Sequence, residues 1–326
     1  MKAICVDEKT KQLYVGEAAE PQLQENDLLV EVRATALNRA DLLQRRGLYP
    51  PPPGASDILG LEMSGVVLKA GVGASGWQPG DRVCGLLPGG GYASRVSLPA
   101  GMAMRIPDEL SFEEAAAIPE AFLTAYLNLM ELGGLRAGQT ALIHAGASGV
   151  GTAAIQLVRE AGAHAIITAG TAAKREAALS LGAQLAIDYK AGPFAPMVME
   201  ATGDRGVEVV LDPVGASYWD QHLEVLAVDG RLVLIGLMGG SKLREVDLGR
   251  LLSRRIQVIG STLRSRSRED KIRLTRDFAA FALPRFADGR LRPVIDTVMD
   301  WSQAGEAHDR MQADANIGKI VLQVQT

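Results

Sequence analysis

Short apolar runs alternate with helical patterns through the second half of the chain. The first run, Thr140 to His144, is followed by apolar residues at helical spacing from Ala153 to Ala161. Five further runs rich in Val, Ile and Leu follow, with helical or turn residues before each of them. Six buried strands that alternate with helices predict a doubly wound parallel α/β sheet. The five further runs are His164 to Ala169, Leu185 to Asp188, Glu208 to Asp212, Arg231 to Ile235 and Ile256 to Ser261.

A glycine-rich turn joins the first run to the first helix. Gly146, Gly149 and Gly151 lie within six residues, and Ser148 stands where the G-x-G-x-x-G pattern has its second glycine. Taken alone, this cluster also fits an ordinary tight loop. Backbone N–H groups at the start of a helix bind anions such as a pyrophosphate. In a strand-turn-helix setting the cluster therefore predicts a dinucleotide-binding Rossmann sheet.

The chain up to about residue 107 has a different, β-rich pattern. Clusters of Gly, Pro and Asp separate its strand-like runs, and no helix-rich crossover comes between them. A mostly antiparallel β domain is expected here, and the strands and helix expected between residues 294 and 324 return to it. We expect domains at 1–118 with 262–326, and at 119–261. The early runs are Lys2 to Val6, Leu28 to Leu37, Gly65 to Ala70, Arg82 to Leu86 and Tyr92 to Leu98.

Composition and charge exclude several classes of partner. The 326 residues are 47% hydrophobic and 22% charged, with a net charge of -4 and no basic stripe, so nucleic acid is not an expected partner. The N-terminus has no signal-peptide pattern, and no apolar stretch suits a membrane span. These features predict a cytoplasmic protein without a membrane partner.

Cysteine and histidine usage gives no metal pattern. The two cysteines, Cys5 and Cys84, are too few for a disulfide framework or a four-cysteine zinc site. The four histidines show no metal-ligand spacing. We interpret His144 and His164, inside apolar runs, as core histidines with satisfied hydrogen bonds.

The loop after the second Rossmann strand indicates which dinucleotide binds. NAD-selective sheets carry an Asp or Glu there, which binds the ribose 2′-hydroxyl. This loop instead has the Thr171 hydroxyl and Lys174, which suit a 2′-phosphate. Two charged hydrogen bonds of about 1.5 kcal/mol each correspond to about a hundredfold preference for NADPH. The alternative is a routine helix cap with surface lysines.

Hydride transfer is the chemistry that remains after other motifs are tested. Val150 stands where a G-x-S-x-G nucleophile elbow needs glycine, and no P-loop lysine follows the glycines. In the β-rich half, Asn38 enters a helix and is placed to cap it. Tyr49 precedes four prolines, which form either a plain linker or a stiff loop that holds the aromatic ring over a cleft.

Several motifs along nearly the whole chain together resemble the medium-chain dehydrogenase/reductase superfamily. They are similar to the quinone oxidoreductase subgroup that includes zeta-crystallin, and most similar to its p53-inducible type. The resemblance implies a GroES-like catalytic domain beside the Rossmann domain. The motifs are LNRADLLQRRG, YPPPPGASDILGLE, PGDRV, HAGASGVGTAAIQL, SYW, LMGG, LRSR and NIGKIVL.

The same resemblance implies the metal status of the site. Zinc-dependent members bind the catalytic metal with a cysteine and a histidine in segments resembling LNRAD and GLE. This chain has Asn38 and Leu61 there, and Glu62 and Asp41 alone do not hold zinc. A zinc-independent enzyme is therefore expected.

The resemblance also implies the residues of the site. Tyr189 has the alternative of a strand-end aromatic, and Asn316 that of a turn residue before the last strand. The implied residues are Asn38, Tyr49 and Thr124 around nicotinamide and substrate; Gly146, Ser148, Gly149, Val150 and Gly151 at the pyrophosphate; Gly170, Thr171, Lys174 and Tyr189 at the adenosine phosphate; and Gly239, Leu263 and Asn316 over the cofactor.

These observations predict NADPH-dependent reduction of a quinone in an interdomain cleft, by hydride transfer or by two one-electron steps. One alternative is reduction of an enone or enoyl double bond, for which Tyr49 would be the acid. The other is a protein that binds NADPH with little turnover. The apolar run Ile256 to Ser261 would be an exposed sheet edge, and a homodimer that pairs these edges would cover it.

Overall fold

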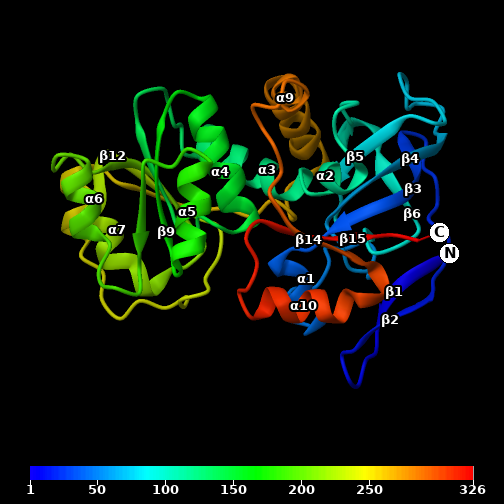
Figure 1. Ribbon diagram of the computed structural model, residues 1–326, viewed down its shortest axis with the longest axis horizontal. Helices are drawn as coiled ribbons and strands as arrows, with labels where there is room; N and C mark the ends of the chain where they lie inside the picture. The colour runs from blue at the N-terminus through cyan, green and yellow to red at the C-terminus, as the bar shows by residue number, and fades with distance from the viewer. Residues whose placement is uncertain (326) are drawn as a thin grey trace. The chain divides into compact units, whose positions relative to one another are not determined.

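The computed structural model describes residues 1–325, and the chain divides into two compact units (Figure 1). The first unit comprises Met1–Leu123 and the segment from Leu263 onward. The second unit comprises Thr124–Thr262. Both ends of the chain therefore belong to the first unit. Among residues 1–325, none of the helices is both long enough and apolar enough to cross a membrane.

The second unit is built on a six-stranded sheet. Its strands lie in the order β10-β9-β8-β11-β12-β13, and every neighbouring pair is parallel. The prediction of six parallel strands is confirmed. The strands are β8 (Thr140–Ile143), β9 (His164–Ala169), β10 (Leu185–Asp188), β11 (Val207–Asp212), β12 (Leu226–Leu234) and β13 (Gln257–Gly260).

Helices connect these strands, and the order of the strands creates a switch point. β8 lies between β9 and β11, so the chain winds in one direction from β8 to β10 and in the other from β11 to β13. Ligands of such sheets bind beyond the carboxyl ends of the strands at this point. The helices are α4 (Gly149–Glu160), α5 (Ala172–Ser180), α6 (Ala195–Ala201), η3 (Ala216–Tyr218), α7 (Trp219–Val225) and α8 (Leu248–Arg254).

The first unit contains a seven-stranded, GroES-like sheet and a two-stranded one. The larger sheet has the order β14-β15-β3-β4-β5-β7, with β6 also paired to β3, and the smaller pairs β1 with β2. All pairs are antiparallel except β14 with β15. The strands are β1 (Lys2–Val6), β2 (Leu13–Glu17), β3 (Asp27–Ala36), β4 (Glu62–Ala70), β5 (Arg82–Leu86), β6 (Arg95–Pro99), β7 (Ala103–Arg105), β14 (Ile295–Asp300) and β15 (Lys319–Gln323).

Helices at the ends of these strands complete the first unit. Ser111 followed three residues later by Glu114 predicts a capping box. The structure confirms it, because the Ser111 hydroxyl accepts from the Glu114 N–H at 3.1 Å and the Glu114 carboxylate accepts from the Ser111 N–H at 2.9 Å. The helices are α1 (Arg39–Arg45), η1 (Ala100–Met102), α2 (Phe112–Ala116), α9 (Arg268–Ala287), η4 (Trp301–Gln303) and α10 (Ala304–Gln312). The helix α3 (Pro119–Tyr126) carries the chain toward the second unit.

The structure differs from the sequence-based expectation at four places. Strands β2 and β7 were not expected, because one is largely exposed and the other is only three residues long. The helix expected from Glu120 to Leu132 changes to a π-helical segment, η2 (Leu127–Leu132), after Tyr126. Asn38 occupies the N-cap position of α1, but its side chain does not cap the helix. That side chain is used elsewhere.

Candidate active site

A buried ion pair lies in the first unit where β4 begins and β15 begins. The Lys319 ammonium is 2.6 Å from the Glu62 carboxylate, and both side chains are buried. The same ammonium donates to the Leu37 carbonyl at 2.6 Å and to the Asn38 side-chain oxygen at 2.7 Å. Lys319 therefore has an acceptor for each of its three N–H groups.

The carboxylate of Glu62 is equally well satisfied. It accepts from the Asn38 amide at 2.9 Å and from the Glu120 backbone N–H at 2.7 Å. The Asn38 side-chain oxygen, the atom that would cap α1, accepts from Lys319 instead. The three side chains of Asn38, Glu62 and Lys319 form one closed network, which we call the Glu62–Lys319 network.

Asp41 lies next to this network and has partners of its own. Its carboxylate accepts from the backbone N–H of Asn38 at 2.8 Å and of Gly60 at 3.2 Å, and the Tyr92 hydroxyl is 3.4 Å away. The Tyr92 hydroxyl is also 3.2 Å from His308 Nε2. Burial raises the pKa of Asp41 to about 6, although these hydrogen bonds and Lys319 oppose the shift.

Tyr49 is paired with an arginine that the sequence analysis did not single out. The guanidinium of Arg264 lies 5.2 Å from the centre of the Tyr49 ring, as in a cation–π contact. Arg264 donates from Nε to the Pro88 carbonyl at 2.8 Å and from Nη2 to Gln44 at 2.7 Å. Its Nη1 is buried and has no hydrogen-bond partner within the described chain. Such a donor is costly unless a ligand accepts from it.

Glu120 is a further acid, close to Tyr49 and Arg264. Burial and the neighbouring Glu62 raise the pKa of Glu120 to about 8, against the opposing effect of Lys319. The charge of Glu120 also contributes to the raised pKa of Tyr49, which is caused mainly by burial. At neutral pH the Glu120 carboxyl is therefore mostly protonated and able to donate.

The glycine-rich turn of the second unit has the expected geometry. Ser148 is the N-cap of α4, and its hydroxyl accepts from the Gly151 N–H at 3.0 Å. A Cβ on Gly146 would lie 2.6 Å from Ile167, and one on Gly151 would lie 2.4 Å from the Ala145 carbonyl oxygen. Glycine is therefore required at both positions, and the first turn of α4 contains Gly149, Val150 and Gly151.

The loop predicted to bind the adenosine phosphate brings four side chains together. Thr171 is the N-cap of α5, and its hydroxyl accepts from the Lys174 N–H at 3.3 Å. A Cβ on Gly170 would lie 2.8 Å from both the Tyr189 hydroxyl and the Lys190 side chain. Tyr189 and Lys190 therefore lie against this loop. Lys190 is a cation that the sequence analysis missed, because it follows a different strand.

The remaining predicted residues have local roles. Gly239 donates to the Val214 carbonyl at 2.7 Å, and a Cβ there would lie 2.1 Å from the Ser217 hydroxyl. Leu263 is buried in the first unit, and the Asn316 amide donates to the Gly318 carbonyl at 2.7 Å in the turn before β15. Thr124, on α3, belongs to the second unit, where its carbonyl accepts from Asn128 at 2.7 Å.

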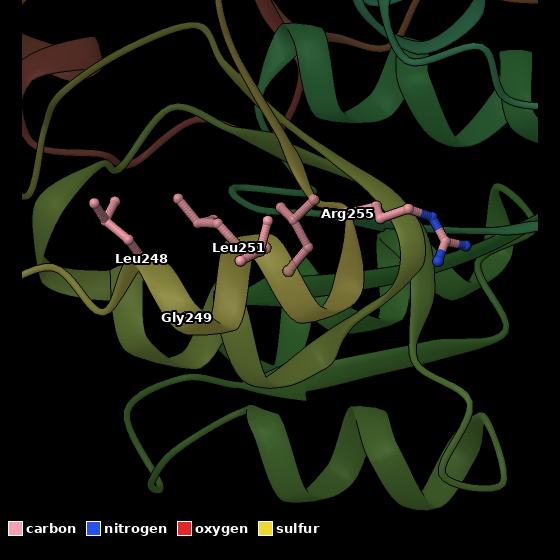
Figure 2. A pocket seen from close by; sticks show the side chains of 6 residues that line it. Leu248, Gly249, Leu251 and Arg255 are labelled. Carbon is pink, nitrogen blue, oxygen red and sulfur yellow. The ribbon is translucent and has the colours of Figure 1, made fainter.

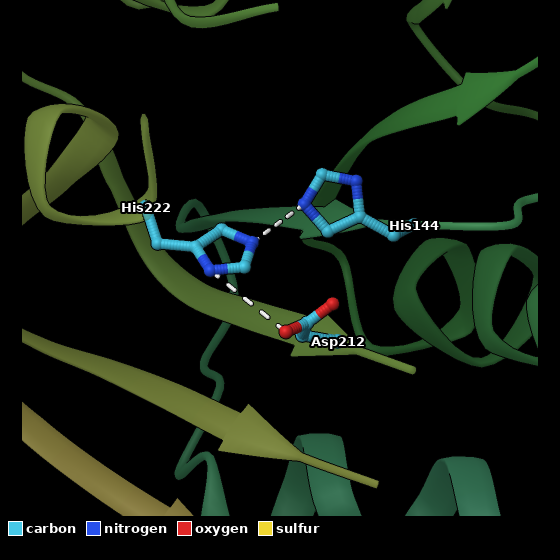
Figure 3. Close-up of side chains that lie close together, drawn as sticks. All are labelled: His144, Asp212 and His222. Carbon is cyan, nitrogen blue, oxygen red and sulfur yellow. Dashed lines mark hydrogen bonds and ion pairs between the residues drawn. The ribbon is translucent and has the colours of Figure 1, made fainter. Parts of the chain in front are cut away.

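Two histidines and an aspartate meet in the core of the second unit (Figure 3). His144 Nε2 is 2.9 Å from His222 Nε2, and His222 Nδ1 is 3.8 Å from the Asp212 carboxylate. His144 is buried as expected, whereas His164 is only partly buried and contacts Gln184 at 2.6 Å. The position of His164 at the start of β9 explains this exposure. Sequence spacing gave no sign of the cluster.

Comparison with known proteins agrees with this architecture. Residues 24–108 match the alcohol dehydrogenase GroES-like domain, and residues 149–279 match the zinc-binding dehydrogenase domain. The human synaptic vesicle membrane protein VAT-1 homolog is 31% identical over 318 residues, which cover 94% of this chain and 81% of that protein. The chain belongs to the medium-chain dehydrogenase/reductase superfamily.

Solved structures of this superfamily include two relatives with different reactions in their names. The quinone oxidoreductase from Thermus thermophilus, solved with and without NADPH, has a TM-score of 0.81 and 33% identity, covering 99% of this chain and 100% of that one. The CurK enoyl reductase has a TM-score of 0.86 and 28% identity, covering 99% of both chains. This chain is therefore an oxidoreductase of the medium-chain superfamily.

The superfamily includes zinc enzymes, so the donor set must be compared with zinc chemistry. Protein zinc ligands are Cys sulfur, His nitrogen or carboxylate oxygen. Positions 38 and 61, where cysteine and histidine ligands are expected, hold an amide and an alkyl chain. The Glu62 carboxylate is paired with Lys319. These residues do not fit a catalytic zinc.

Proposed function

We propose that this protein is an NADPH-dependent, zinc-independent reductase whose substrate is a quinone. The observation that carries the proposal is the Tyr49–Arg264 pair with its unpartnered Nη1. An aromatic face beside a buried, unsatisfied cation suits a flat molecule with carbonyl oxygens. The balanced reaction is quinone plus NADPH plus a proton, giving hydroquinone and NADP⁺.

The cofactor of this protein is NADP(H), and the residues proposed to bind its phosphates lie in the second unit. Gly146 packs closely on Ile167 and Gly151 on the Ala145 carbonyl, and the N-terminus of α4 that this turn forms suits a pyrophosphate. The loop of Thr171 and Lys174, with Lys190 beside it, suits the 2′-phosphate. When bound, NADPH supplies the hydride for the reduction.

The residues of the first unit have separate roles in this proposal. Arg264 donates from Nη1 to a carbonyl oxygen of the substrate and stabilises the negative charge that develops there. Tyr49 contacts the ring of the substrate. The Glu62–Lys319 network holds Asn38 and the start of α3 rigidly, because each of its buried polar groups already has a partner.

The second candidate is reduction of an activated carbon–carbon double bond. Similarity to the CurK enoyl reductase favours it, as does the presence of two protonated groups, Glu120 and Tyr49, near Arg264. This reaction requires a proton on carbon, so an acid in the site would be essential. Quinone reduction places the proton on oxygen, which solvent also supplies.

One comparison of variants separates the two reactions. NADPH and NADH oxidation is measured on zinc-free protein with an ortho-quinone, a para-quinone and an enone. We expect faster oxidation of NADPH with the quinones, and a small effect of Tyr49→Phe, because only the hydroxyl is lost. Tyr14→Phe is the matched control, since Tyr14 is an exposed residue of β2 in the same unit.

The alternative outcomes of this comparison lead to different conclusions. Turnover of the enone alone, lost in Tyr49→Phe, would establish the double-bond reductase. Absence of turnover with every acceptor, despite NADPH binding, would support a binding protein. An unchanged quinone KM in Arg264→Met would contradict the role of Arg264, because loss of a charged hydrogen bond of about 1.5–3 kcal/mol should raise it more than tenfold.

We also propose that the protein is a homodimer joined at β13. This strand lies at an edge of the parallel sheet, and Val258 on it is exposed. The neighbouring helix α8 presents Leu248 and Leu252, which are 68% and 82% exposed. A hollow of about 610 Å³ lies beside them. Figure 2 shows the residues that line it, which are Leu248, Gly249, Leu251, Leu252, Arg255 and Ile256. A second copy of the chain would cover this edge and this apolar surface.

A further inference from the structure

Four buried polar side chains form a continuous chain through the second unit. The Thr168 hydroxyl is 2.9 Å from His144 Nδ1, His144 Nε2 is 2.9 Å from His222 Nε2, and His222 Nδ1 faces Asp212 at 3.8 Å (Figure 3). All four are at most 2% exposed. We call this series from Thr168 to Asp212 the histidine chain.

One arrangement of protons gives an acceptor to every donor in the histidine chain except His222 Nδ1, which is 3.8 Å from Asp212 and has no hydrogen-bond partner among residues 1–325. Thr168 donates to His144, His144 donates to His222, and the remaining N–H of His222 points at the Asp212 carboxylate. Burial lowers the pKa of His144 well below its usual value and that of His222 to about 3, so both imidazoles are neutral. The aromatic rings of Phe194 and Tyr218, each 4.8 Å from His144, shield the contact.

A metal ion explains this geometry less well. His222 presents different nitrogens to its two neighbours, Nε2 to His144 and Nδ1 to Asp212. A single ion at about 2.0–2.2 Å from its ligands needs all three donor atoms to face one point. One donor atom of each residue lies within 4.8 Å of the other two, but the His222 nitrogen that faces His144 is not the one that faces Asp212.

The histidine chain joins the ends of the three strands at the switch point. His144 directly follows β8 and precedes the glycine-rich turn, and Thr168 lies two residues before Gly170 on β9. Asp212 ends β11 on the other side of the switch point. Each of these residues therefore stands just before a loop beyond the carboxyl ends of the strands, where the dinucleotide binds.

Asp212 extends the connection to a further loop. Its carboxylate accepts from the backbone N–H groups of Val214 at 2.7 Å and Gly215 at 2.9 Å. The segment they belong to is in turn hydrogen-bonded to the loop that contains Gly239, through Gly239 N–H to Val214 at 2.7 Å. The side chain of His222, from α7, is the link between this pair of loops and the glycine-rich turn.

We propose that His222 is a positioning residue for NADP(H). Through the histidine chain, His222 holds the loops after β8, β9 and β11 in fixed positions relative to one another. The inference rests on the proposed assignment of these loops to the cofactor. The Thr168–His144 and His144–His222 contacts are hydrogen bonds of 2.9 Å with directional geometry, and His222 then faces the Asp212 carboxylate at 3.8 Å. Loss of His222 would loosen the cofactor site without touching the substrate residues of the first unit.

The test is the NADPH dissociation constant, measured by calorimetry on the purified full chain. We expect His222→Leu to bind NADPH at least tenfold more weakly than the wild type, to raise the KM for NADPH and to leave the KM for the quinone unchanged. His222→Gln, which keeps one amide group within the chain, should recover part of the affinity. His164→Leu is the matched control, because it removes a histidine at the opposite end of the same sheet.

A double variant separates positioning from a merely structural role. His222→Leu leaves the His144 Nε2 proton without an acceptor, which destabilises the fold. His144→Leu/His222→Leu removes both imidazoles and should recover thermal stability while NADPH affinity stays low. Recovery of affinity together with stability would overturn the proposal.

Three other results would also decide against it. Affinity within twofold of the wild type in His222→Leu and in His222→Gln would exclude a positioning role while leaving the proposed function intact. A wild type that does not bind NADPH would refute the proposed function itself and this inference with it. Stoichiometric metal in the wild type, lost in His222→Leu, would make the cluster a metal site instead.

Discussion

Glu62 and Lys319 show that a buried charge is tolerated when one residue of opposite charge pairs with it. Each is costly to bury alone, and together with Asn38 they satisfy every polar atom of the network. Removing one member therefore leaves an uncompensated charge in the interior. The energetic consequence is larger than the strength of the ion pair itself.

We expect Lys319→Met to lower the free energy of unfolding by about 3–5 kcal/mol, because the Glu62 carboxylate loses its cation. Denaturant titration followed by circular dichroism measures this change. The double variant Glu62→Gln/Lys319→Met should regain part of the loss. Arg290→Met is the control, since its pair with Asp288 is exposed and its loss should leave the unfolding midpoint nearly unchanged. An equal loss of unfolding free energy in Lys319→Met and in the control variant would contradict this account.

The raised pKa of Glu120 predicts how the stability of the fold depends on pH. Its pKa is raised to about 8 in the folded protein, mainly by burial, whereas an unfolded chain has the ordinary value near 4.5. The folded state therefore favours the protonated acid, and its contribution to stability is lost as the pH rises from about 4.5 to 8. Glu120→Gln stays neutral and should become more stable relative to the wild type over this interval.

Thermal unfolding of the wild type and Glu120→Gln at several pH values measures this difference directly. Asp41, whose pKa is raised to about 6, is present in both proteins, and its charge contributes to the raised pKa of Glu120. A constant difference between the two proteins from pH 5 to 9 would show that Glu120 titrates normally. An enone reduction that slows above pH 8 only in the wild type would further identify Glu120 as the acid.

The sequence was least informative about which residues are the partners of single site residues. Tyr49 and Asn38 follow from local motifs and from the resemblance. Their partners Arg264 and Lys319 do not, because more than two hundred positions separate them along the chain. No periodicity or spacing rule predicts which distant cation compensates a buried acid.

At the scale of elements, the turn before α4 depends on close backbone contacts. A Cβ on Gly151 would lie 2.4 Å from the Ala145 carbonyl oxygen, which is backbone and moves little. Gly151→Ala should therefore destabilise the protein by about 1–3 kcal/mol and weaken NADPH binding. Gly305→Ala, in α10 with open space around it, should instead stabilise by about 0.5–1 kcal/mol. Equal stability of the two variants would contradict the close contact.

The elements themselves divide into predictable and unpredictable ones for physical reasons. The central strands β8, β9 and β11 of the parallel sheet are largely buried, so their apolar runs stand out, and the bounds of β9 and β10 match the expectation. The exposed hairpin strand β2 has no such run. The π-helical segment η2 has the same apolar pattern as an α-helix, so composition does not reveal it.

At the scale of the whole molecule, the exposed edge of the parallel sheet predicts the oligomeric state. We expect the wild type to sediment as a dimer and Leu252→Glu to sediment as a monomer, because a buried carboxylate would oppose association. Val72→Glu is the control, since Val72 is 94% exposed in a loop of the first unit. A monomeric wild type would refute the proposed homodimer.

The pairing of Lys319 with Asn38, 281 positions earlier, also bears on how the protein is made. A ribosome releases β3 and Glu62 long before β15 and Lys319. Until β15 is synthesised, β3 therefore lacks this neighbouring strand and Glu62 lacks its cation. The second unit, Thr124–Thr262, draws all its strands from one uninterrupted segment. During synthesis the nucleotide-binding sheet can therefore fold before the unit whose translation began first.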